Sequence, residues 1–227
     1  MTTTSARSRI AVAAALVALS GGGWAVPAHA APPSSTTLTL TSPTAAYGQS
    51  VTATAQVVLP GGTPNGKVYF AVDGTSYMAS INSGGIATYT LPRDVAVGQH
   101  AVSATFVPRY PDQQQGSESV PASLVVAKAR TFVQVRITGR GAHVPTSAVI
   151  GAVGDFGTRP TGPVTVTARH LGTGKVTRRE RTLDPSGAAT ARLGILRTGT
   201  YRLRVTYAGD AQHLASRESE KFTVRQR

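Results

Sequence analysis

Apolar and polar residues alternate along most of the chain after residue 30. The clearest runs are Val51, Ala53, Ala55 and Val57 and, later, Val133, Val135 and Ile137. Successive side chains of a β-strand point to opposite faces, so a period of two predicts strands with one buried and one exposed face. After residue 30, no stretch carries a sustained 3.6-residue apolar period. The pattern therefore predicts an all-β fold.

Turn-forming residues separate these runs at intervals of roughly one strand length. They stand at residues 60–62, 73–74, 82–85, 172–174 and 184–187 and are mainly Gly, Pro, Asn, Asp and Ser. Such spacing predicts about six or seven short strands per hundred residues. Short antiparallel strands in that number are typical of a β-sandwich, in which two sheets bury their inward-pointing side chains between them.

The second half of the chain repeats the order of the first. Pro64-Asn65-Gly66 recurs as Pro160-Thr161-Gly162, and the alternation beginning Gly98-Gln99-His100 recurs as Gly199-Thr200-Tyr201. We therefore divide the chain into a first repeat, residues 36–127, and a second repeat, residues 128–227. Each is long enough to bury its own core. Residues 31–35 are expected to form a disordered tail.

The doubled order of motifs resembles a known family. In each copy a strand, a P-x-G turn, another strand and the pattern G-x-A-x-x-x-L follow one another, and the second copy adds Tyr207-Ala208-Gly209-Asp210, close to a Y-x-G-D turn. This order resembles the bacterial Ig-like repeats of secreted and surface proteins. The resemblance implies two tandem Ig-like antiparallel β-sandwiches that serve as spacers or adhesive modules, and it implies architecture more than chemistry.

One residue of each repeat is assigned a structural role from this resemblance. Tyr201 stands where strand F of an Ig-like fold begins, at a corner where a tyrosine hydroxyl bonds back to upstream backbone. His100 stands in the same register of the first repeat, and an imidazole N–H can make a similar bond. A corner role explains both residues without a ligand.

The first thirty residues have the features of an export signal. Arg7 and Arg9 precede an apolar run at residues 10–19, and Ala28-His29-Ala30 matches the small-x-small pattern read by signal peptidase. Ten residues of helix span about 15 Å, half of a bilayer core of roughly 30 Å. We therefore expect cleavage after Ala30, a mature chain without a transmembrane segment, and a secreted protein in an extracellular or cell-wall-associated location.

Composition excludes some classes of protein and shows an uneven charge. The chain has no Cys, which excludes a disulfide scaffold and a thiol enzyme. The second repeat carries 18 Lys and Arg against 6 Asp and Glu, a net charge of +12, whereas residues 31–127 carry 3 against 4, a net charge of −1. A compositional bias explains the choice of Arg over Lys, but it does not explain the difference between the repeats.

Strand parity predicts where five cations of the second repeat lie. If its apolar residues point inward, the residues next to them point outward. Neighbouring strands of one Ig-like sheet would then share an outer face that carries Arg169, Arg202, Arg204, Lys221 and Arg225. Like charges on adjacent strands repel, so we interpret this face as an anion-binding site. Residues 178–181 are expected on an edge strand, where charges discourage pairing with another sheet.

Patterns for catalysis and metal binding are not found in the sequence. No G-x-S-x-G string occurs after residue 30, the His residues are scattered, and no acids alternate as they do in a calcium loop. We therefore expect no catalytic residue, no metal and no cofactor. A DNA-reading helix and a basic strip flanked by aromatic residues are also missing, so no specific nucleic-acid partner is expected.

The leading hypothesis is a non-catalytic exported protein that acts as an extracellular adhesion or interaction module. Its basic second repeat would contact an anionic cell-wall polymer or an acidic protein. The alternative is a purely structural spacer without a ligand of its own. Retention of the protein on an anionic surface would support the interaction module, and a lack of retention would support the spacer.

Overall fold

Strands make up almost all the regular structure of residues 31–226, the part of the chain that the computed structural model describes. Buried and exposed residues alternate within most of them, which confirms the prediction of an all-β fold. The predicted export signal, with its cleavage point after Ala30, lies outside the described residues. Within the described range, no helix has the length and apolar character needed to cross a bilayer.

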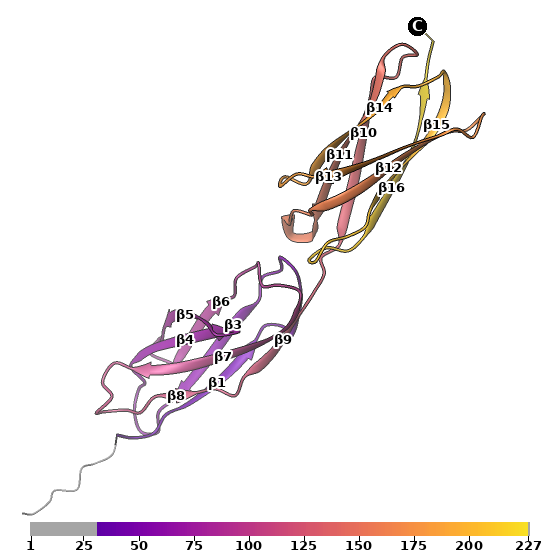
Figure 1. Ribbon diagram of the computed structural model, residues 1–227. Coiled ribbons are helices and arrows are strands. Elements are labelled where there is room, and N and C mark those ends of the chain that lie inside the picture. The colour runs from indigo at the N-terminus through magenta and orange to yellow at the C-terminus, as the bar shows by residue number, and fades with distance from the viewer. Residues whose placement is uncertain (1–30, 227) are drawn as a thin grey trace, which may run out of the picture. The chain divides into compact units, whose positions relative to one another are not determined.

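The first repeat is a sandwich of two sheets (Figure 1, indigo to magenta). One sheet has the order β1-β3-β6, and the other has the order β2-β9-β7-β4-β5, with β8 paired to β7. The core between them includes the fully buried Val57, Phe70 and Phe106. The strands are β1 (Ser35–Leu40), β2 (Thr44–Ala46), β3 (Thr52–Val58), β4 (Gly66–Val72), β5 (Thr75–Ser80), β6 (Ile86–Thr90), β7 (Gly98–Pro108), β8 (Ser117–Glu118) and β9 (Ala122–Ala127).

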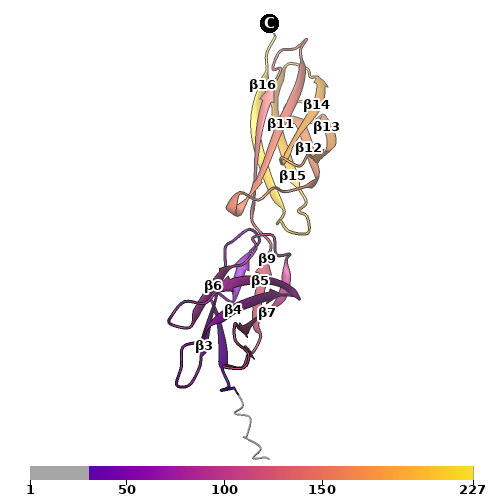
Figure 2. The same ribbon diagram turned by 90° about the vertical axis from the view of Figure 1, so that its left-hand side faces the viewer.

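The second repeat is a sandwich with the same order of strands, seen from two sides in Figures 1 and 2. Its sheets are β10-β11-β14 and β13-β12-β15-β16. Its core includes Ile150, Val166 and Leu203, each at most 1% exposed, and shares no residue with the core of the first repeat. The elements are β10 (Thr131–Thr138), β11 (Pro145–Gly154), the 3-10 turn η1 (Asp155–Gly157), β12 (Gly162–His170), β13 (Val176–Leu183), β14 (Ala188–Ile195), β15 (Gly199–Tyr207) and β16 (Ser216–Val224).

One turn recurs with the same geometry in both repeats. Asn82 Oδ1 accepts two backbone N–H bonds at 2.9 and 3.0 Å, and Asp184 Oδ1 accepts two at the same distances. Gly85 and Gly187 follow with φ of +77° and +81°. A Cβ atom at either glycine would lie 2.3 Å from a backbone carbonyl oxygen, so only glycine fits. The repeat in the sequence is therefore also a repeat of turn geometry.

Strand pairing is antiparallel, as predicted, except at the short β2. This strand pairs in parallel with β9, through residues 44–46 and 125–127. The second repeat has a reduced counterpart, an isolated parallel bridge between Gly141 and Arg225. In both repeats the segment after the first strand thus crosses to the other sheet, where it pairs with the last strand or its end.

The prediction of a disordered tail at residues 31–35 is wrong. Ser35 begins β1 and pairs with Val58. The Ser34 hydroxyl donates to the backbone oxygen of Gln115 at 2.6 Å, and the Gln115 N–H donates to the backbone oxygen of Pro32 at 3.0 Å. The tail is held because the loop before β8 supplies partners for its polar groups, a contact that no local pattern in the sequence reveals.

Candidate anion-binding face

Three cations stand side by side across one sheet of the second repeat. Arg169 on β12 is the register partner of Arg202 on β15, and Arg202 is also the partner of Lys221 on β16. Directly opposed residues of antiparallel strands point to the same face, with Cβ atoms about 4.5–5.5 Å apart. These three side chains therefore form a single row, which we call the cationic row.

The cationic row faces solvent because the adjacent residues of each strand fill the core. Ala168, Leu203 and Phe222 each flank one member of the row, and each is at most 3% exposed. The members of the row are all exposed. Alternation along the three strands thus fixes the direction of the charges, as the parity argument predicts.

Further cations lie on the same face. Arg204 is opposite Thr167 on one side and Ser219 on the other, and Thr167 is in turn opposite Arg178 on β13. Arg217 lies one row further along β16. Hydroxyl groups thus separate the charges of these outer rows. We use the name basic face for the set Arg169, Arg178, Arg202, Arg204, Arg217 and Lys221.

Most acidic residues of this sheet lie on its other side. Glu218 and Glu220 on β16 are paired with core residues of β15 and so share their inward parity. Glu180 on β13 lies on the basic face, where its carboxylate is 2.9 Å from Arg178 Nη2. Among residues 31–226, the other five cations of the basic face have no carboxylate within 4.0 Å. The positive charge of this face is therefore largely uncompensated.

Arg225, the fifth cation predicted from the sequence, lies just beyond the end of β16. Its backbone N–H donates to the carbonyl oxygen of Arg140 at 2.9 Å. Arg225, Arg140 and Lys221 together line a hollow of about 810 Å³ at this end of the sheet. The structure thus places four of the five predicted cations on paired strands and the fifth at the end of those strands.

Two arginines of β13 point away from the basic face. Arg179 and Arg181 pair with core valines of β12 and lie on the inner side of the sheet at its edge. Arg179 Nε donates to the backbone oxygen of Arg192 at 3.1 Å, and Arg181 Nε donates to that of Thr190 at 3.3 Å, both on β14 of the other sheet. We call these two side chains the edge clamp. They occupy carbonyl groups that an added strand would otherwise bind.

The two predicted corner residues make equivalent contacts. The Tyr201 hydroxyl donates to the backbone oxygen of Arg197 at 3.0 Å. In the first repeat, His100 Nε2 lies 2.7 Å from the backbone oxygen of Ala96. Each side chain thus bonds to the backbone four residues upstream of itself. The imidazole takes the place of the phenol.

Sequence reasoning missed Arg178 and Arg217 on the basic face and Arg140 beside Arg225. Arg217 shares the parity of Lys221 on the same strand, so a longer application of the alternation would have found it. Arg178 gave no such signal, because Leu183 is the one buried residue of β13. Its direction follows only from the register with β12, which the local sequence does not contain.

The first repeat matches a known family. The model of the bacterial Ig-like domain, group 3, matches residues 38–127. The first repeat is a bacterial Ig-like domain. The second repeat has the same order of paired strands, so the chain is a tandem of two Ig-like β-sandwiches. No curated protein matches the sequence.

Two solved structures are among those similar to this Ig-like tandem. The adhesin InvE of Yersinia pseudotuberculosis is 17% identical, with a TM-score of 0.42, and the match covers 82% of this chain and 58% of that one. The fibronectin(III)-like modules of CbhA from Clostridium thermocellum are 18% identical, with a TM-score of 0.32, and the match covers 83% of this chain and 94% of that one. The tandem thus spans less than two thirds of the InvE chain.

Proposed function

We propose that this protein is a non-catalytic, exported Ig-like repeat protein that acts as an extracellular interaction module. Its second repeat contacts an anionic cell-wall polymer or an acidic protein through the basic face. The predicted export signal at residues 1–30 and the Ig-like family of the first repeat support a location outside the cell. The basic face supplies the binding chemistry.

The cationic row is the observation that carries this proposal. Arg169, Arg202 and Lys221 are adjacent on three paired strands, and no carboxylate of the described residues lies within 4.0 Å of them. Each close pair of like charges costs on the order of tenths of a kcal/mol in water and salt. Bound anions would remove this repulsion, so the row favours a partner of negative charge.

The shape and chemistry of the basic face favour an extended anionic partner. Its cations spread over all four strands of a sheet, from β13 to β16, with Thr167 and Ser219 hydroxyls between some of them. Guanidinium groups bind carboxylate and phosphate oxygens through paired hydrogen bonds. Many exposed contacts of this kind give a binding free energy that weakens as salt rises.

Fractionation of expressing cells at two salt concentrations tests the proposal. We expect the protein in the wall fraction at low salt and in the medium after a wash at moderate salt. The variant Arg202→Ser, Arg204→Ser, Arg225→Ser should appear in the medium at both salt concentrations, because it loses two cations of the basic face and the one at its end.

A matched variant removes the same number of charges elsewhere in the second repeat. Arg130, Arg136 and Arg192 are exposed and lie off the basic face, so their replacement by Ser should leave the protein in the wall fraction at low salt. Identical partitioning of the wild type and the basic-face variant would overturn the proposal and favour a structural spacer. Equal loss from both variants would also overturn it, because net charge alone would then explain retention.

A further inference from the structure

A hollow at one end of the first repeat gathers most of that repeat's positive charge. Its volume is about 710 Å³, and its walls come from the loop before β4, the start of β4, the β5–β6 turn and the end of β7. Residues 31–127 contain three Lys and Arg residues, and two of them, Lys67 and Arg109, line this hollow. The first repeat carries a net charge of −1, so a general excess of cations does not explain why Lys67 and Arg109 line the same hollow.

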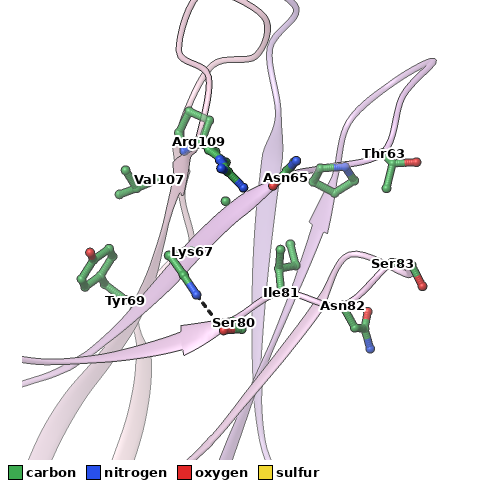
Figure 3. A pocket seen from close by; sticks show the side chains of 13 residues that line it. Thr63, Asn65, Lys67, Tyr69, Ser80, Ile81, Asn82, Ser83, Val107 and Arg109 are labelled. Carbon is green, nitrogen blue, oxygen red and sulfur yellow. Dashed lines mark hydrogen bonds between the residues drawn. The ribbon is translucent and has the colours of Figure 1, made fainter.

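Lys67 lies on β4 and Arg109 directly follows β7, and neither has an acidic partner at the hollow (Figure 3). Lys67 Nζ donates to the Ser80 hydroxyl at 2.8 Å, and the Arg109 guanidinium lies 5.4 Å from the centre of the Tyr110 ring. No Asp or Glu lines the hollow. Among the described residues, no carboxylate lies within 4.0 Å of either cation. Two charges are thus available to an anion.

The wall formed by the loop before β4 is held in place. The Asn65 N–H donates to Gln114 Oε1 at 3.2 Å, and Gln114 Nε2 donates back to the Asn65 carbonyl oxygen at 3.2 Å. Gln114 is only 5% exposed. A Cβ atom at Gly66 would lie 2.2 Å from the backbone oxygen of Val107, so the start of β4, directly after this loop, is in close contact with the end of β7. A hollow with fixed walls costs little ordering when a ligand binds.

The other wall is the β5–β6 turn, which the Asn82 side chain closes through two backbone N–H bonds. An apolar side chain, Ile81, lies between the two walls, which carry the hydroxyls of Thr63 and Ser83, and the half-buried aromatic ring of Tyr69 lies further along β4, beyond Lys67 (Figure 3). The lining thus combines apolar surface, neutral hydrogen-bonding groups and two cations. Its volume lies in the range of small-molecule sites.

The second repeat shows that the Ig-like fold does not need this cation pair. Lys67 follows the P-x-G turn, and the residue at that place in the second repeat is Pro163. Arg109 lies three residues after Phe106, and the counterpart of Phe106 is Tyr207, which puts Asp210 in place of the arginine. The Asp210 carboxylate accepts a hydrogen bond from the Gln212 N–H of its own loop at 2.8 Å and one from the Thr161 N–H, just before β12, at 2.9 Å. The fold is built there with an acid in place of a base.

We propose that the hollow of the first repeat binds an acidic saccharide of one or two sugar units. A carboxylate on the sugar binds Lys67 and Arg109. The sugar hydroxyls exchange hydrogen bonds with the neutral polar groups of the lining, and the apolar side of the ring rests on Tyr69. This site is separate from the basic face and does not depend on it.

Titration of the ¹⁵N-labelled protein with digalacturonic acid, followed by NMR, tests this site. We expect saturable amide shifts at residues that line the hollow, such as Lys67, Ser80 and Val107, with a dissociation constant on the order of 1 mM. Maltose, a neutral disaccharide, should give no saturable shift, and inorganic phosphate should bind about tenfold more weakly than the acidic disaccharide.

Variants separate the hollow from general charge effects. Lys67→Gln with Arg109→Gln should weaken digalacturonate binding about tenfold or more, and Tyr69→Ala should weaken it as well. Arg93→Gln removes the third Lys or Arg residue of residues 31–127, which does not line the hollow, and should leave binding unchanged. Binding that is absent, equal for maltose or phosphate, or unchanged in the double variant would overturn the proposal. Shifts confined to the basic face would overturn this site while supporting the proposed function.

Discussion

The His100 ring and the Asp73 carboxylate form a close ion pair at the corner of the first repeat, with His100 Nδ1 2.5 Å from Asp73 Oδ2. The other ring nitrogen faces the backbone oxygen of Ala96 at 2.7 Å. Two acceptors around one ring favour the doubly protonated imidazolium. The hydrogen bond with Asp73 raises the pKa of His100 above its ordinary 6.5, although burial opposes it, and the same bond lowers the pKa of Asp73 below its ordinary 3.8.

These two shifts predict a pH window for the stability of the first repeat. A raised His pKa contributes stability below pH 6.5 that is lost as pH rises through the folded-state pKa of His100. A lowered Asp pKa contributes stability above pH 3.8 that is lost as pH falls through the folded-state pKa of Asp73. NMR titration should therefore show His100 with a pKa above 6.5, and Asp73→Asn should bring it back toward 6.5. A His100 pKa at or below 6.5 in the wild type would contradict this account.

Removing the Tyr201 hydroxyl should destabilise the second repeat. Tyr201→Phe keeps the ring, which is 5% exposed, and removes the bond to the Arg197 backbone oxygen. One such bond contributes about 1 kcal/mol, which should appear as a lower free energy of unfolding in urea. Tyr110→Phe, at a ring that is 44% exposed, is the matched control and should change it by less than about 0.5 kcal/mol. If both variants change the free energy of unfolding equally, the structural role assigned to Tyr201 at this corner is wrong.

Loss of the edge clamp should make the protein self-associate. Arg179→Thr with Arg181→Thr frees the backbone oxygens on β14, so that another sheet can join at this edge. Sedimentation should then show oligomers that increase with protein concentration. Arg169→Thr with Arg178→Thr removes the same charge from the outer face and should not produce them. If both variants associate alike, reduced net charge rather than an open edge is the cause.

Substitution of Gly66 tests the close approach that fixes the wall of the hollow. Gly66→Ala places a Cβ atom 2.2 Å from the Val107 oxygen and should destabilise the first repeat by about 2 kcal/mol, as overpacking does. Gly151, in the middle of β11, has nothing within 4 Å of a built Cβ, so Gly151→Ala should be neutral or stabilising. Denaturant unfolding of the two variants compares them directly. If Gly66→Ala lowers the free energy of unfolding no more than Gly151→Ala does, the backbone around Val107 can shift to make room, and the contact does not fix the wall.

The alternation of apolar and polar residues predicted side-chain directions only on strands that have one apolar side. It placed Leu203 inside and Arg202 outside correctly, because one strand with a dry and a wet face contains that information in its own residues. It gave no direction for Arg178, whose strand has no apolar side of its own. The hollow of the first repeat was also out of reach, because Lys67 and Arg109 meet only when the start of β4 pairs with the end of β7.

The packing of Phe222 determines more than the stability of the last strand. Along β16, basic residues alternate with Glu218 and Glu220, so the register of this strand decides which sign of charge it shows to water. A slip of one residue would turn both glutamates outward among the arginines and would also expose Phe222. The aromatic ring, 3% exposed, penalises that slip. Burial of one hydrophobic side chain thus determines which charges the opposite side of its own strand presents to solvent.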